Sequence, residues 1–187
     1  FCLDTYAERK PLNLDEDNIA SEYKDVEAWT THRKRAWTAL MSGAHYDYID
    51  FSIINYCETG TPQSREHIRS WMKHLSRFVH SLDLPRTAPR RDLLKEQPPH
   101  TCASVLAVAD TGLCIYLADE RERDQPGAGE PITGHVTLDL PNGKYRVAHF
   151  APATGLYSPW LPVEGGPGTH LLLEAFEHDI VVRIVKD

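Results

Sequence analysis

Three consecutive acidic residues, Asp15, Glu16 and Asp17, are the first candidates for chemistry in this sequence. They follow a short, mostly apolar run, Pro11–Leu14, and so stand where a short strand would end. A carboxylate in that position can attack the anomeric carbon of a sugar or stabilise an oxocarbenium-like transition state. The cluster equally suits a solvated loop or a helix N-terminus, where the helix dipole favours acids.

A second polar group lies in the β-rich stretch 45–54, HYDYIDFSII. Alternation along a strand places His45 and Asp47 on one face and Tyr46 and Tyr48 on the other. His45 and Asp47 are both metal-ligand types, but two ligands are fewer than protein zinc sites use. The sequence therefore predicts no metal site and no other cofactor.

Two aromatic residues, Tyr157 and Trp160, stand in the Gly- and Pro-rich segment 154–169. Exposed aromatic rings can stack on the apolar faces of sugars, which makes the pair a candidate binding surface. Alternatively, both rings pack at the edge of the neighbouring strands or against the first half of the chain. The residues alone leave both interpretations open.

The first half of the chain must position the polar groups, and its apolar spacing predicts two helices. Apolar residues at helical spacing cover 26–41, and Gly43 suits the C-terminal end of that helix. Thr61 and Pro62 suit the N-cap and first position of a second helix, whose apolar stripe runs over 68–82.

Each predicted helix follows a predicted strand in this half. That order favours parallel strands covered by helices, and two such units are too few to cover a parallel sheet. The half therefore resembles a piece of a larger α/β structure. We expect Arg33, Lys34 and Arg35 to lie on the solvated side of the first helix.

The second half has a different composition and predicts only strands. Residues 1–100 hold 2 glycines and residues 101–187 hold 9. Asp110–Gly112 and Asn142–Gly143 are hairpin signals between apolar runs, and six to eight short strands follow one another closely. We expect an antiparallel β-sandwich at 100–187, after a first domain at 1–88 and a Pro-rich linker at 89–99.

Charge and cysteine content exclude some functions. Residues 101–187 carry 12 acids and 6 bases, and the whole chain has a net charge of −7, which argues against a nucleic-acid or anionic-membrane partner. No apolar run approaches the length of a membrane span. The four cysteines, Cys2, Cys57, Cys102 and Cys114, lack metal-ligand spacing, and we expect idle thiols.

Residues 10–18, KPLNLDEDN, resemble the seventh-strand segment of bacterial cellulase-like glycosidases, which have a (β/α)8 barrel and a C-terminal sandwich labelled collagen-binding. In that family a Lys-Pro or Arg-Pro pair opens the strand and a glutamate closes it. Residues 36–44, AWTALMSGA, are similar to the junction before the eighth strand. Residues 143–147, 151–155 and 179–182 are similar to the terminal sandwich.

The resemblance implies that Glu16 is the nucleophile of a retaining glycoside hydrolase and that the chain holds the last two βα units of its barrel. The general acid/base comes from the fourth strand in related barrels, and this chain has none. We therefore expect the C-terminal part of a longer, exported (extracellular or periplasmic) enzyme, inactive alone, with a carbohydrate substrate and the missing N-terminal barrel portion as partners.

Four further residues are expected to bind the substrate, namely His45 and Tyr46 at the second strand and Tyr157 and Trp160 in the sandwich. Two alternatives to the enzyme interpretation stay open. The sandwich could be a carbohydrate- or collagen-binding module, or a structural cap docked on the barrel through Trp71 and Phe78.

Overall fold

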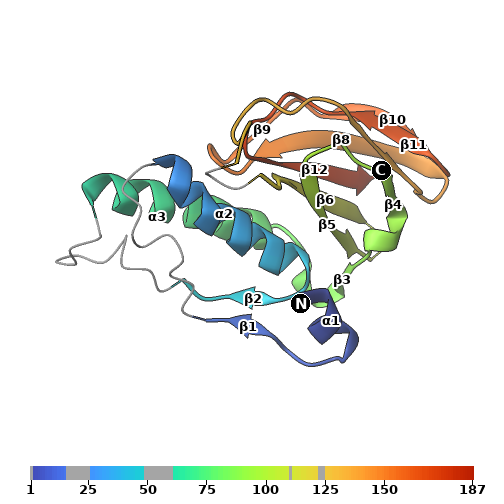
Figure 1. Ribbon diagram of the computed structural model, residues 1–187. Helices are drawn as coiled ribbons and strands as arrows, with labels where there is room; N and C mark the ends of the chain where they lie inside the picture. The colour runs from blue at the N-terminus through green and yellow to red at the C-terminus, as the bar shows by residue number, and fades with distance from the viewer. Residues whose placement is uncertain (1, 16–25, 49–60, 110, 122–124) are drawn as a thin grey trace.

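The computed structural model describes residues 2–15, 26–48, 61–109, 111–121 and 125–187. Strands hold more of these residues than helices do, and the helices gather on one side of the larger sheet (Figure 1). The helices are α1 (Cys2–Ala7), α2 (Val26–Met41) and α3 (Pro62–Val79). The strands are β1 (Asn13–Leu14), β2 (His45–Tyr46), β3 (Thr87–Pro89), β4 (Leu94–Glu96), β5 (Thr101–Val108), β6 (Gly112–Asp119), β7 (His135–Leu138), β8 (Gly143–Ala151), β9 (Leu156–Tyr157), β10 (Leu161–Gly165), β11 (Thr169–Leu172) and β12 (Asp179–Lys186).

The strands β1 and β2 are parallel neighbours, as the strand–helix–strand order predicts. Asn13 pairs with His45 and Leu14 with Tyr46. The backbone N–H of Asp47 donates to the Leu14 carbonyl at 2.9 Å, which carries the pairing past the end of β2. Both strands lie on the side of α2 away from the antiparallel sheets (Figure 1).

Helix α3 begins where the sequence predicts, because its first turn is capped by side chains. Thr61 Oγ1 accepts from the Ser64 N–H at 3.0 Å, and Ser64 Oγ accepts from the Thr61 N–H at 2.9 Å. This reciprocal capping box satisfies two N–H groups that a helix start would otherwise leave open. The buried face of α3 consists of Ser64, Ile68, Trp71, Leu75, Phe78 and Val79.

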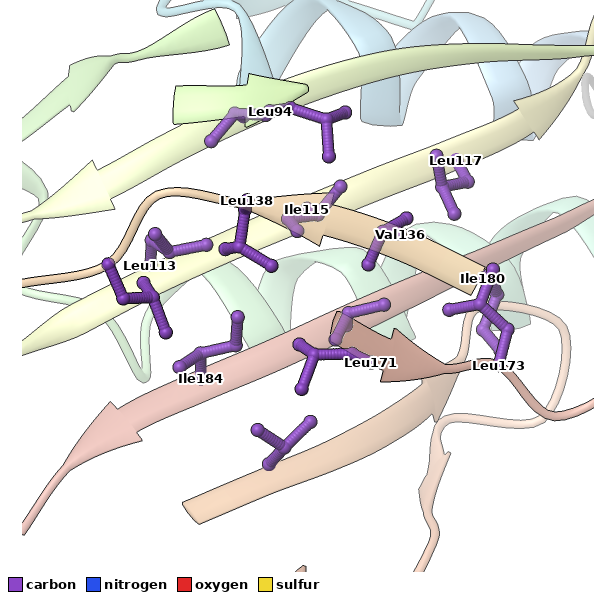
Figure 2. Close-up of a cluster of buried hydrophobic side chains, with 14 of the residues drawn as sticks. Leu94, Leu113, Ile115, Leu117, Val136, Leu138, Leu171, Leu173, Ile180 and Ile184 are labelled. Atoms are coloured by element: carbon purple, nitrogen blue, oxygen red, sulfur yellow. The ribbon is translucent and has the colours of Figure 1, made fainter. Parts of the chain in front are cut away.

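Two antiparallel sheets face each other across the main hydrophobic cluster. The larger sheet has the order β10-β8-β12-β6-β5-β3, with β9 paired to β8, and the smaller has the order β11-β7-β4. Figure 2 shows Leu113, Ile115 and Leu117 of β6 beside Val136 and Leu138 of β7 and Leu171 of β11. All six side chains are buried.

The second face of the larger sheet is covered by α2 and α3. Trp37 of α2 stacks on Tyr116 of β6 at a centroid distance of 5.6 Å and meets Phe78 of α3 edge-on at 5.0 Å. Because both faces of the sheet are covered, every residue of β6 after Gly112 is buried. No helix among the described residues is long and apolar enough to cross a membrane.

Two features of the sheets differ from the sequence predictions. Asn142–Gly143 does not close a hairpin, because β7 belongs to the smaller sheet and β8 to the larger one. Asn142–Gly143 is a local turn signal. The partner of β8 is instead decided by its long antiparallel pairing with β12, a strand distant in sequence. Part of the expected linker 89–99 is also paired, since β4 joins β7 through Leu94 and Leu138.

Candidate active-site strand ends and the aromatic pair

The parallel strands present one polar, exposed face. Asn13, Asp15, His45 and Asp47 are exposed on it, and Asn13 Nδ2 donates to Asp15 Oδ1 at 3.3 Å. The intervening Leu14, Tyr46 and Tyr48 are partly buried. Alternation therefore brings two carboxylates, an amide and an imidazole to the same face of β1 and β2.

Glu16, the predicted nucleophile, lies outside the described residues, as does Asp17. The described neighbour, Asp15, continues the exposed face of β1. Strand alternation assigns Asp15 to the face of His45 and Asp47.

His45 and Tyr46 were both predicted to bind substrate, and the structure separates them. The His45 side chain is exposed beside Asn13, its partner in register. Tyr46 is partly buried and packs against the cluster between the helices and the larger sheet. Only His45 shares the polar face of the strand ends.

Arg33 is the main residue that the sequence prediction placed wrongly. It is not on the solvated side of α2: its guanidinium binds the Asp179 carboxylate with Nη2–Oδ1 at 2.7 Å and Nε–Oδ2 at 2.9 Å. The Arg33 and Asp179 side chains are 3% and 1% exposed. A bidentate partner 146 residues away makes burial of the arginine tolerable, and periodicity within the helix cannot reveal such a partner.

Two aromatic residues complete this buried ion pair. The Tyr116 hydroxyl donates to Asp179 Oδ2 at 3.1 Å, and the Arg33 guanidinium carbon lies 4.5 Å from the Trp71 ring centroid. Burial, reinforced by the Asp179 charge, raises the pKa of Tyr116 well above its ordinary value, so the phenol remains a donor. The cluster joins α2 and α3 to the first residue of β12.

A groove of about 830 Å³ runs along β1 and α2. It is lined by Cys2, Leu12, Asn13, Leu14, Asp15, Thr31, Lys34, Arg35, Thr38, Ala39, Cys102, Ala118, Asp119 and Glu120. Lys34 Nζ donates to the Asp119 carbonyl at 2.9 Å across it. Among the described strands, β1 pairs with β2 alone, so its other edge is open, and both residues of β1 line the groove.

Tyr157 and Trp160 lie together at the edge of the larger sheet. Their ring centroids are 5.9 Å apart with an interplanar angle of 23°, and the residues are 42% and 40% exposed. Tyr157 also contacts Phe150 at 4.8 Å and Phe78 at 6.4 Å. The pair is thus anchored on the helix–sheet cluster, as the cap interpretation requires, and half open, as the binding interpretation requires.

Metal ligands and cysteine pairs are not assembled in the described part of the chain. No group of three or more His, Cys, Asp or Glu side chains there could hold a metal ion. The three cysteines it contains, Cys2, Cys102 and Cys114, form no disulfide with one another. Burial raises the pKa of the Cys114 thiol, and the Arg183 guanidinium donates to its sulfur at 2.8 Å.

No protein-family model and no curated protein sequence matches the chain. Solved structures do share its fold. A glycoside hydrolase of family 5 from Bacteroides vulgatus is 14% identical with a TM-score of 0.65, over 95% of this chain and 42% of that chain. A protein described as a glycoside hydrolase is 13% identical with a TM-score of 0.66, over 95% and 43%.

A family 30 endoxylanase from Clostridium papyrosolvens is 11% identical with a TM-score of 0.54, over 98% of this chain and 44% of that chain. At these identities the similarity establishes a common fold. The chain spans less than half the length of each of the three structures.

Proposed function

We propose that this chain is the C-terminal part of a retaining glycoside hydrolase, formed by the last two βα units of a (β/α)8 barrel and an antiparallel β-sandwich. The parallel pair of β1 and β2, with a polar face of Asp15, His45 and Asp47, is the observation that supports this most. The fold shared with glycoside hydrolases over 95% of the chain supports it further. The substrate would be an oligo- or polysaccharide.

Glu16 is the proposed nucleophile, directly after the exposed Asp15. Its carboxylate attacks the anomeric carbon while the glycosidic C–O bond breaks, and an acid supplied by the missing part of the barrel protonates the leaving oxygen. Water then cleaves the glycosyl ester, and the same acid, now a base, takes the proton. His45 is proposed to bind a sugar hydroxyl on the polar face.

The missing N-terminal barrel portion is the proposed partner of the groove and of the open edge of β1. Backbone N–H and C=O groups on an unpaired strand edge readily accept another strand. Leu12 and Leu14 would be covered by the helix that connects the neighbouring strand to β1 in a barrel. The acid/base residue would come from that portion, so the 187-residue chain alone should not turn over a glycoside.

The contact between helices and larger sheet supports a second role for the sandwich, as a structural cap. Trp37, Phe78, Tyr116 and Phe150 form one aromatic cluster across it. Trp71 takes part through Arg33 and its ion pair with Asp179. The sandwich would then hold the last barrel helices in place, and this role is compatible with catalysis.

Site-directed variants of the longer enzyme test the nucleophile. Glu16→Gln should lower turnover by about three orders of magnitude or more, since loss of a covalent catalyst costs roughly 4 kcal/mol of transition-state stabilisation. Asp15→Asn is the matched control, because it removes the neighbouring carboxylate, and should reduce turnover far less. Undiminished turnover of Glu16→Gln would refute the assignment.

A further inference from the structure

The exposed apolar side chains of the described residues are concentrated at one edge of the larger sheet. Four of the large ones stand within six positions, on β9, at the start of β10 and between them: Leu156, Tyr157, Trp160 and Leu161. The other three tryptophans, Trp29, Trp37 and Trp71, are at most 5% exposed. Trp160, at 40%, is thus the exposed tryptophan of this chain.

The two rings at this edge are held by contacts within the protein. Tyr157 is wedged against Phe150 and Phe78, and the Arg146 guanidinium lies 5.8 Å from the Trp160 ring centroid. Arg146 is itself held by Asp187, with Nε–Oδ1 at 2.8 Å. Rings ordered in advance lose little conformational entropy on binding, which favours their use as a platform.

A small cleft with a mixed polar and apolar lining adjoins the ring platform. It has a volume of about 240 Å³ between α3 and the turn that follows β8, and Tyr157 forms part of its wall. Its polar lining comes from His74, Arg77, Ser81 and Thr154. Within the part of the chain that the structure describes, the Arg77 side chain makes no hydrogen bond or ion pair, so its guanidinium donors are available to a ligand.

We propose that Tyr157, Trp160 and this cleft form a glycan-binding site for a chain of equatorially linked pyranose sugars. Such sugars expose flat faces of C–H groups, which can pack against the exposed parts of the Tyr157 and Trp160 rings. Their equatorial hydroxyls project from the edge of the sugar ring, where Arg77 and Thr154 can donate and Ser81, whose hydroxyl donates to the Phe78 carbonyl, can accept. A few convergent polar groups beside an apolar surface are typical of small-molecule sites.

The site deepens the proposed function, on which it rests for the source of the sugar chain, and it is separate from the strand ends. β9 lies on the far side of α2 and α3 from β1 and β2 (Figure 1). A polysaccharide held at the sheet edge would stay near the enzyme between cleavage events. Binding there requires neither Glu16 nor the missing acid.

Tryptophan fluorescence of the 187-residue chain tests the site directly, because the other three tryptophans are buried. Titration with cellohexaose or xylohexaose, both equatorially linked, should change the emission and protect it from acrylamide quenching. Isothermal titration of the same sugars should give a Kd that Trp160→Ala or Tyr157→Ala weakens at least about tenfold, equivalent to roughly 1.4 kcal/mol. Maltohexaose, which has an axial link, should bind more weakly.

Tyr6→Ala is the matched control, since Tyr6 on α1 is 39% exposed and lies in another part of the fold. It should bind both sugars with the wild-type Kd, and near-UV circular dichroism should show that all variants are folded. Absence of binding to both equatorially linked sugars, or an unchanged Kd in Trp160→Ala, would overturn the proposal. Because the readout is binding, its failure is distinguishable from a failure of catalysis by Glu16.

Discussion

The guanidinium of Arg33 and the carboxylate of Asp179 form a buried, bidentate ion pair, with Nη2–Oδ1 at 2.7 Å. Arg33 belongs to the helix layer beside the parallel strands, and Asp179 begins the strand at the centre of the larger sheet. The pair therefore couples the part of the chain with the candidate strand ends to the part with the aromatic platform.

Removal of one partner of this pair should destabilise the protein strongly. We expect Arg33→Met to lower the free energy of unfolding by about 3–5 kcal/mol, because Asp179 is left charged and buried. Urea denaturation followed by circular dichroism measures the change. Arg90→Met is the control, since its ion pair with Asp92 is exposed and should contribute less than about 1 kcal/mol.

The double variant Arg33→Met/Asp179→Leu separates charge burial from loss of packing. It should recover part of the lost stability, because no uncompensated charge remains in the interior. A double variant that is no more stable than Arg33→Met alone would contradict the assignment of the loss to the buried carboxylate.

Acid stability should depend on Asp119. Burial acts to raise the pKa of its carboxyl, but hydrogen bonds from Arg121 and from the Gly129 N–H outweigh burial, so the pKa is lowered from 3.8. A lowered pKa in the folded state stabilises the protein above pH 3.8, and this stabilisation is lost as the pH falls through the folded-state pKa. Asp119→Asn should therefore be less stable at neutral pH and lose less on acidification.

Urea midpoints measured from pH 7 down to acid conditions give the pH dependence of stability for the wild type and for Asp119→Asn. Asp92→Asn is the comparison, because its carboxyl also has a lowered pKa, caused first by the Arg90 hydrogen bond, but is solvent-exposed. A wild type and an Asp119→Asn variant with parallel pH profiles would show that Asp119 does not contribute.

The capping box of α3 should contribute measurably to the free energy of unfolding, which urea denaturation reports. Thr61→Ala removes the acceptor of the Ser64 N–H and is expected to cost about 1 kcal/mol of unfolding free energy. Gln63→Ala, on the exposed side of the same turn, should change stability by only a few tenths. Equal effects of the two substitutions would show that the cap bonds contribute no net stability.

A side chain at Gly155, in the turn between β8 and β9, should push against His74. A Cβ there would lie 2.6 Å from His74 Cδ2, and the residue has φ +71°. Gly168→Ala is a matched control with φ +68° and no atom within 4 Å of the added Cβ. Backbone strain should destabilise both variants by about 1–2 kcal/mol. Gly155→Ala alone should also weaken cellohexaose binding, because the added Cβ displaces His74 in the wall of the cleft.

Local signals in the sequence predicted much of this fold. The apolar spacing of 26–41 predicted α2, Thr61 and Pro62 marked the start of α3, and the hairpin signal at Asp110–Gly112 predicted the antiparallel pairing of β5 with β6. In each case the information lies within one helix or one turn. Partners distant in sequence were missed, as the buried Arg33 and the separation of β7 from β8 show.

The candidate site was predictable only in part for the same reason. Strand alternation correctly separated His45 from Tyr46, but the burial of Tyr46 depends on helices that pack against it from elsewhere in the chain. The exposure of Trp160 likewise depends on where β9 meets α3. So does the lack of a described hydrogen-bond partner for the Arg77 side chain. No pattern within residues 154–169 carries that information.

Covalent labelling of the proposed longer glycoside hydrolase tests the central claim most directly. An activated 2-deoxy-2-fluoro glycoside of the sugar that it hydrolyses should inactivate it and leave one glycosyl group on the nucleophile. Fragment-ion mass spectrometry of the peptide that contains Asp15 and Glu16 then assigns the modified carboxylate. We predict a single label on Glu16. A label on Asp15, or on a residue outside this peptide, would contradict the account.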